Sequence, residues 1–188
     1  MSSQPKPFFT PEEYLEIERK SEFRSEYYAG EMFALAGASK QHNLIAGNIF
    51  AAFHRQFIAR SCNVYQSDMR VKVSATGLYT YPDVVVVCGE EKFDDSHRDL
   101  LLNPVVIVEV LSESTEGYDR GKKFEHYQQI ESLTEYLLVA QEPYRIERYV
   151  RQTAAQWLYT EAHQAEDVVK LETIDCALAL KDVYAKVA

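Results

Sequence analysis

Cysteine is scarce in this 188-residue sequence. The three cysteines are Cys62, Cys88 and Cys176, which lie far apart and form no C-x-x-C pair. An odd and widely spaced set argues against a disulfide framework and a zinc ribbon, and it is typical of proteins in a reducing compartment. The five histidines also show neither an H-E-x-x-H pair nor zinc-finger spacing, so no zinc site is expected.

Long apolar segments are missing as well. No run approaches the roughly 18 consecutive apolar residues that a membrane-spanning helix requires. The N-terminal segment carries prolines and glutamates instead of the apolar core of a secretory signal. We therefore predict a cytoplasmic protein with no membrane partner. Repeats, low-complexity segments and linkers are also absent from the sequence, which indicates one domain spanning residues 1–188.

Positive charge is in short supply, with 20 lysines and arginines against 29 aspartates and glutamates and a net charge of -9. Proteins that coat nucleic acid without specificity are usually basic, because neutralised phosphates supply most of the affinity. Tight general DNA binding is therefore not expected. An acidic enzyme can still act on DNA when metal ions bridge its carboxylates to the phosphate.

Helical and strand signals alternate along the chain. Capping residues and helical periodicity predict helices at 10–20, 39–57 and 118–130. Thr10 opens a capping box for the first helix and Ser39 caps the second, while a hairpin turning at Ala29-Gly30 is expected between them. Segments rich in β-branched residues predict strands at 64–73, 81–88, 105–111, 135–140, 145–151 and 156–160. This order predicts a mixed α/β (α+β) fold built in layers.

Two acidic residues stand out in apolar surroundings. Asp83 precedes the run Val84–Val87, and Glu109 follows the run Val105–Val108. Uninterrupted valine runs are typical of central strands covered on both faces, and a lone buried carboxylate costs several kcal/mol unless it is paired, protonated or bound to a cation. Two such acids on neighbouring strands can bind one divalent ion, and oxygen ligands favour Mg²⁺ or Mn²⁺. Alternatively, Asp83 is a turn or strand-start residue after Pro82, and Glu109 pairs with a buried arginine.

A lysine falls on the apolar face of the helix expected at 118–130. On a helical wheel, Lys123 lies in the arc defined by Phe124, Tyr127 and Ile130. A lysine that faces the sheet needs an anionic partner, and the acids on the neighbouring strands are candidates; the alternative is a lysine that snorkels to water. Aspartate, glutamate and lysine around a metal ion would suit hydrolysis of a phosphodiester.

Short motifs occur in the order found in a large bacterial family. They are Gly30-Glu31, Ser39-x-x-His42, Pro82-Asp83, Val108-Glu109-Val110-Leu111-Ser112, Asp119-Arg120-x-x-Lys123-x-x-x-Tyr127 and Glu135-Tyr136-Leu137-Leu138-Val139. Together they make the chain, over roughly residues 8 to 183, resemble the restriction endonucleases of the PD-(D/E)XK nuclease superfamily.

The resemblance implies a restriction-endonuclease-like fold, with a central mixed sheet flanked by helices, and DNA as the substrate. It implies Asp83 and Glu109 as ligands of Mg²⁺, with Mn²⁺ as a substitute and the Val110 carbonyl completing the coordination. The superfamily pattern places a lysine two residues after the acid, where this sequence has Leu111. In the family that this chain resembles, a lysine on the following helix takes that role, which matches Lys123.

Two further residues are candidates for the site. His42, near the start of the second helix, would contact phosphate or a ligand carboxylate, or alternatively make a structural hydrogen bond near the cap. Glu31, after the turn glycine, would be a third carboxylate, or alternatively a solvated hairpin residue. Asp119 and Arg120 are expected to begin the helix rather than to take part in chemistry.

These observations predict a metal-dependent DNA endonuclease in which Asp83 and Glu109 bind Mg²⁺ and Lys123 assists the attacking water. The alternative is a non-catalytic dimeric interaction or nucleic-acid-handling module that keeps the fold and uses the acids as a polar network. A third hypothesis is a metal-dependent phosphodiesterase that acts on RNA or a small nucleotide, and the sequence does not distinguish it from the DNA endonuclease. A homodimer is expected, because double-strand cutting with one site per chain needs two chains and symmetric dimers are the commonest assembly.

Overall fold

A six-stranded sheet lies at the centre of the structure, a computed structural model that describes residues 8–94 and 96–187. Its strands are β3 (Cys62–Gln66), β6 (Val84–Cys88), β8 (Val106–Val110), β9 (Glu135–Val139), β10 (Ile146–Thr153) and β11 (Gln156–Ala162). They lie in the order β11-β10-β9-β8-β6-β3. Strands β8 and β9 are parallel and all other neighbours are antiparallel, so the sheet is mixed.

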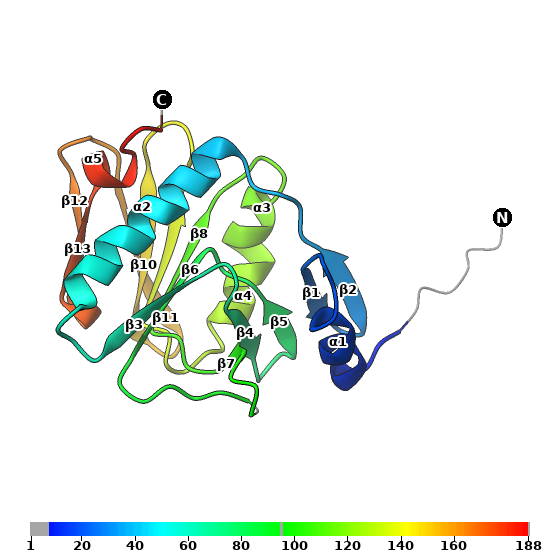
Figure 1. Ribbon diagram of the computed structural model, residues 1–188. Coiled ribbons are helices and arrows are strands. Elements are labelled where there is room, and N and C mark those ends of the chain that lie inside the picture. Colours follow the sequence, from blue (N-terminus) through cyan, green and yellow to red (C-terminus); the bar gives the residue numbers. More distant parts are fainter. Residues whose placement is uncertain (1–7, 95, 188) are drawn as a thin grey trace.

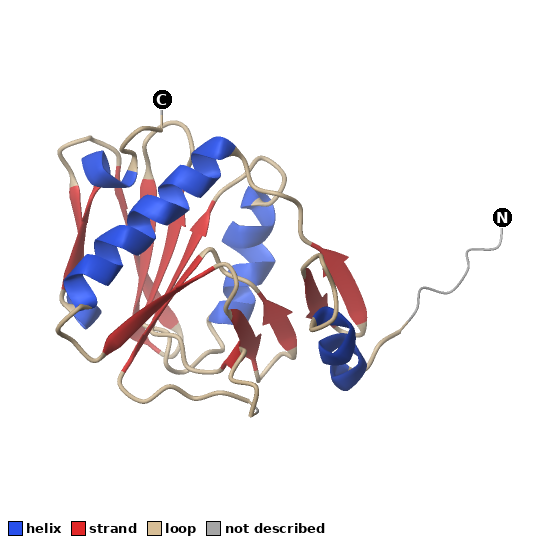
Figure 2. Cartoon of the chain, in the orientation of Figure 1, coloured by secondary structure: helices blue, strands red, loops and turns tan. Residues whose placement is uncertain are grey.

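Helices cover both faces of this sheet (Figures 1 and 2). On one face, Val84 and Val86 share a core with α2 (Lys40–Phe57) and α5 (Leu180–Val183). On the other face, Val85 and Val87 share a core with Tyr127, at the end of a helical segment. The valine run is therefore buried on both faces, as predicted. Among the helices of the described residues, none is long and apolar enough to cross a membrane.

The helical segment on the second face has an unusual middle. It consists of α3 (Glu116–Tyr118), a π-helical turn (Asp119–Lys123) and α4 (Phe124–Tyr127). A π-helix is rare and occurs mostly as a single turn inside an α-helix, frequently at a functional site. The predicted helix at 118–130 is thus present, but it begins two residues earlier and ends three residues earlier.

A second sheet stands beside the first and carries α1 (Pro11–Glu18). Its order is β2-β1-β5-β4-β7, and its strands are β1 (Ser25–Tyr28), β2 (Glu31–Ala34), β4 (Arg70–Val73), β5 (Leu78–Thr80) and β7 (Leu100–Leu101). Tyr14 of α1 stacks on Tyr27 with ring centroids 4.9 Å apart and meets the edge of Tyr79 at 5.4 Å. This aromatic core fixes α1 and the first hairpin at one side of the large sheet (Figure 1).

Local signals near the N-terminus are confirmed. Thr10 and Glu13 form the predicted capping box, although the helix ends at Glu18 instead of Lys20. The hairpin turns at Ala29 and Gly30, which both have positive φ, as a type I′ connection requires.

Two of the strand predictions fail, because a turn or a pairing between distant segments determines the structure there. The strand predicted at 64–73 is two strands in different sheets, β3 and β4, separated by a turn at residues 67–69. Serine and aspartate in that turn favour local side-chain hydrogen bonds over a continuing strand. The small sheet of β12 (Val168–Leu171) and β13 (Cys176–Ala179), with a 3₁₀ turn (Glu172–Ile174) between them, was not predicted.

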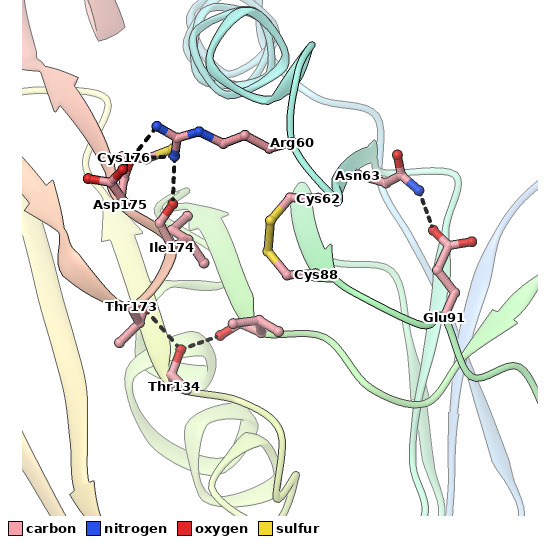
Figure 3. Close-up of a disulfide and its surroundings, with 11 residues drawn as sticks. Arg60, Cys62, Asn63, Cys88, Glu91, Thr134, Thr173, Ile174, Asp175 and Cys176 are labelled. Atoms are coloured by element: carbon pink, nitrogen blue, oxygen red, sulfur yellow. Dashed lines mark hydrogen bonds and ion pairs between the residues drawn. A yellow bond between two sulfur atoms is a disulfide. The ribbon is translucent and has the colours of Figure 1, made fainter.

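The expectation that the cysteines stay unpaired is wrong. Cys62 at the start of β3 and Cys88 at the end of β6 are register partners and form a disulfide (Figure 3). A separation of 26 residues along the chain conceals this pairing, because it depends on which strands become neighbours. Cys176 is free and buried, and Arg60 lies beside it. The cysteine pattern therefore no longer supports a reducing compartment.

Candidate active site

A cleft of 1220 Å³ opens between the second sheet and the large sheet. Its wall contains the predicted residues His42, Asp83, Glu109, Val110 and Lys123, but not Glu31. The lining carries only four permanently cationic side chains against eight carboxylates, those of Glu18, Glu22, Glu26, Asp68, Asp83, Asp99, Glu109 and Asp119. A cleft of this charge repels a phosphate backbone unless cations enter it.

Asp83 is held by two partners at the start of β6. Its Oδ2 accepts a hydrogen bond from the Val110 amide at 2.8 Å and lies 3.1 Å from His42 Nε2. Ser39 caps α2, and its hydroxyl oxygen accepts a hydrogen bond from the His42 amide at 3.0 Å. This cap places His42 in the first turn of the helix, within reach of Asp83. Burial alone would lower the pKa of His42, but the hydrogen bond and charge of Asp83 outweigh that effect and raise it. His42 therefore contacts a carboxylate, that of Asp83, as one of its two alternatives predicted.

Glu109 is buried in the middle of the large sheet, at 4 % exposure. Its Oε1 accepts a hydrogen bond from the Tyr127 hydroxyl at 2.7 Å and lies 2.9 Å from Lys123 Nζ. Burial raises the pKa of Glu109 to about 8, against the opposing charge of Lys123. Because the charge of Asp119 adds to the rise, this carboxylate is a strong acceptor for a proton or a metal ion.

Lys123 lies among three carboxylates. Its Nζ is 2.9 Å from Glu109 Oε1, 3.3 Å from Glu26 Oε1 and 3.5 Å from Asp119 Oδ1. Burial lowers the pKa of Lys123, but these three charges outweigh it and keep the pKa well above its ordinary value. The ammonium is therefore permanently charged, and at 6 % exposure it does not reach solvent as a snorkelling lysine would. We call Lys123, Glu26, Glu109 and Asp119 the Lys123 cluster.

Two members of this cluster, Asp119 and Glu26, were not predicted to belong to the site. Asp119 was expected only to begin a helix, whereas the π turn buries it at 3 % exposure beside Lys123. Glu26 was not singled out. It lies on β1 and accepts a hydrogen bond from the Thr80 hydroxyl, while Glu31 lies on the paired strand β2. No local signal marked it, because Glu26 lies between Ser25 and Tyr27 and its burial depends on the second sheet that β1 joins.

The residue types fit a hard divalent cation. Asp83 and Glu109 offer carboxylate oxygens, which Mg²⁺ and Mn²⁺ prefer. In residues 8–94 and 96–187, however, no three histidine, cysteine or acidic side chains already surround a common point. The carboxylate oxygens of Asp83 and Glu109 instead contact His42 and Lys123, respectively. A metal ion would therefore have to compete with Lys123 and His42 for the carboxylates.

Comparisons with known proteins agree with this fold. The Uma2 family model, described as "Putative restriction endonuclease", matches residues 11–181. Two uncharacterized proteins of Synechocystis are 40 % and 34 % identical, over 81 % and 99 % of this chain and 86 % and 96 % of their own lengths. The crystal structure of a "putative nuclease" from Anabaena variabilis superposes with a TM-score of 0.78 at 16 % identity, covering 96 % of this chain and 99 % of that one. The predicted nuclease-like α/β fold is thereby confirmed.

Proposed function

The chain belongs to the Uma2 family, and we propose that it is a metal-dependent endonuclease that hydrolyses phosphodiester bonds of DNA. The observation that carries this proposal is the Lys123 cluster, in which one buried lysine faces three buried carboxylates, next to Asp83. Such a cluster holds excess negative charge in a medium of low dielectric constant. A divalent cation would offset that charge, and a proton on Glu109 is the alternative.

Asp83 and Glu109 would hold the ion, with the Val110 carbonyl as a third ligand. The Val110 amide and His42 both engage Oδ2 of Asp83, so Oδ1 is the oxygen left to face a cation. His42 acts as a positioning residue, because it holds this carboxylate at a fixed angle. When bound, Mg²⁺ supplies positive charge at the scissile phosphate and lowers the pKa of a bound water.

Lys123 would orient the attacking water and stabilise charge that develops on the phosphate. Glu26 and Asp119 explain how it could remain in place. If Glu109 turned towards a metal ion, these two carboxylates would still lie within 3.5 Å of the ammonium. We therefore assign them to positioning Lys123, a role that leaves Glu109 free for the ion.

Cleavage of supercoiled plasmid and single-stranded DNA with Mg²⁺, Mn²⁺ or EDTA tests the proposal. We expect metal-dependent cleavage that Glu109→Gln abolishes. The matched control is Glu125→Gln, the same chemical change at an exposed position of α4, which should cleave normally. Cleavage that persists in Glu109→Gln would exclude Glu109 as a ligand.

A non-catalytic module remains the second candidate. One observation favours it, since Lys123 pairs with three carboxylates and so already offsets part of the charge that a metal ion would neutralise. Thermal unfolding separates the two functions, because an ion that binds only the folded state raises the melting temperature. If Mg²⁺ and Mn²⁺ stabilise neither the natural protein nor Glu109→Gln, the module is the better description.

We also propose a homodimer, which two cuts on opposite strands would require. β11 is an edge strand of the large sheet and exposes Leu158 at 52 % and Tyr159 at 47 %. Light scattering on the natural protein and on a Leu158→Lys, Tyr159→Lys double variant tests whether this edge is the interface. A monomeric natural protein would refute it.

A further inference from the structure

The cleft has a second group of buried charges, outside the Lys123 cluster. Glu18 ends α1, Arg70 begins β4, and the Tyr81 hydroxyl bridges them. Arg70 Nε donates to the Tyr81 oxygen at 2.8 Å, and the Tyr81 hydroxyl donates to Glu18 Oε1 at 2.9 Å. All three side chains line the cleft that contains Asp83. We call them the Arg70–Glu18 pair, with Tyr81 as its bridge.

Each member of this pair has one side-chain atom without a hydrogen-bond partner. Arg70 Nη1 and Glu18 Oε2 are both shielded from solvent and unpartnered, on side chains only 4 % and 6 % exposed. Within the described part of the chain, no carboxylate forms an ion pair with Arg70. Buried polar groups almost always find partners, so two orphans in one cleft wall point to a ligand that satisfies them.

The ligand must present an acceptor and a donor together. The Arg70 nitrogen needs an acceptor and the Glu18 oxygen needs a donor. A phosphate offers only acceptors, and the Glu18 carboxylate would repel its charge. The edge of a nucleobase offers both kinds of group. Guanine fits best, because its O6 is the acceptor that arginine most often binds and its N2 amino group can donate to a carboxylate.

An aromatic side chain on the same wall fits this ligand. Phe23, in the loop between α1 and β1, lines the cleft and is 76 % exposed. An exposed phenylalanine in a polar cleft has no role in packing the core, whereas a base can stack on its face. Arg24 follows it and also lines the cleft.

We propose that the Arg70–Glu18 pair and Phe23 form a subsite for one unstacked nucleobase, preferentially guanine. The inference rests on the proposed nuclease function only for the position of that base in the substrate. Tyr81 stands two residues before Asp83, about 7 Å along an extended chain. The base therefore belongs to a nucleotide next to the cleaved phosphate, and the DNA must be single-stranded or locally unpaired there.

Nuclear magnetic resonance saturation transfer from the protein to free nucleosides tests the subsite. Guanosine, adenosine, cytidine and thymidine are the probes, because they are uncharged and need no metal ion to enter an acidic cleft. We expect weak binding, because both orphan atoms are shielded from solvent and a base must displace whatever covers them. Guanosine should be preferred, because it offers the acceptor and the donor that these two atoms need. Phe23→Ala should weaken guanosine binding at least about fivefold. Phe33→Ala, an exposed phenylalanine of β2 outside the cleft, is the matched control.

Glu18→Gln tests the readout separately from stacking. It should remove the preference for guanosine while the affinities for the other nucleosides change little. Equal binding of all four nucleosides, no nucleoside binding at all, or guanosine binding that survives both variants would overturn the proposal. Because Phe23 is exposed, its variant keeps the test valid even if Glu18→Gln fails to fold.

The two proposals fail differently. A protein that binds guanosine through Phe23 and Glu18 but cleaves no DNA with any metal keeps the subsite and loses the nuclease. A protein that cleaves DNA in a metal-dependent way but binds no nucleoside keeps the nuclease and loses the subsite.

Discussion

The two charged groups in the cleft treat buried charge in opposite ways. In the Lys123 cluster, a single cation faces three carboxylates and each of these lies within 3.5 Å of it. In the Arg70–Glu18 pair, an arginine and a glutamate share one tyrosine hydroxyl and each leaves an atom without a partner. The first group has surplus negative charge, which suits a metal ion, whereas the second has surplus hydrogen-bonding capacity, which suits a neutral polar ligand.

Removing the lysine should break the first group most severely. Lys123→Met leaves Glu26, Glu109 and Asp119 buried without a counter-charge, and breaking a buried pair in this way costs about 3–5 kcal/mol. Urea unfolding of the metal-free protein measures the loss. Lys122→Met is the control, because Lys122 is exposed and its loss should change stability by less than about 0.5 kcal/mol. Equal effects of the two variants would show that the cluster is not electrostatically coupled.

The pH dependence of stability sharpens the contrast. The pKa of Glu109 rises from 4.5 to about 8 in the folded protein, so the folded state holds this proton more tightly than the unfolded state. Protonation of Glu109 therefore stabilises the fold fully below about pH 4.5, and this contribution is lost as the pH rises through about 8. We expect the metal-free natural protein to lose stability across that window, by a few kcal/mol.

Glu109→Gln should have a flatter profile over the same pH range, because glutamine has no proton to lose. Urea unfolding at several pH values, in EDTA, measures both slopes. Parallel profiles would mean that another group accounts for the pH dependence.

Glu26 and Glu31 test which acid of the first hairpin belongs to the site. Glu26→Gln removes one of the charges that hold Lys123, and we expect cleavage to fall about tenfold, which corresponds to about 1.4 kcal/mol. Glu31→Gln should leave cleavage unchanged, since Glu31 does not line the cleft. Cleavage rates of the two variants under one set of conditions decide between them, and the reverse order would restore Glu31 as the site residue.

The Arg70–Glu18 pair should be the least sensitive to loss of a charge. Glu18→Gln keeps a hydrogen-bond acceptor for Tyr81 and for the Ser25 amide, which Glu18 Oε1 now binds. We expect stability to change by no more than about 1 kcal/mol, measured by urea unfolding beside Lys123→Met. A loss as large as that of Lys123→Met would show that the pair is structural and needs no ligand.

The same contrast explains what could be predicted from the sequence. Asp83 and Glu109 were visible because an acid in a valine run violates the local pattern, and Lys123 because it interrupts an apolar helix face. Their convergence follows from the pairing of β6 with β8. Glu26 and Asp119 remained hidden because their burial depends on a second sheet and on a π turn, neither of which leaves a periodic signal.

The Arg70–Glu18 pair could not be predicted for a related reason. Glu18 and Arg70 are 52 positions apart in the numbering, and each looks like an ordinary surface charge in its own segment. They meet only because β4 separates from β3 at a three-residue turn and joins the other sheet. Strand exchange between sheets is a tertiary event, and local propensity does not report it.

The disulfide has a topological consequence. Residues 62–88 form one covalent ring, and this ring carries Arg70 and Tyr81 as well as Asp83. The chain cut once inside the ring, for example at the turn of residues 67–69, would remain a single covalent object until a reductant opened the bridge. After limited proteolysis, a gel without reductant would show the cut chain as one band, and a gel with reductant would show it as two fragments. Arg70 and Tyr81 would stay tethered to Asp83 even in a nicked molecule.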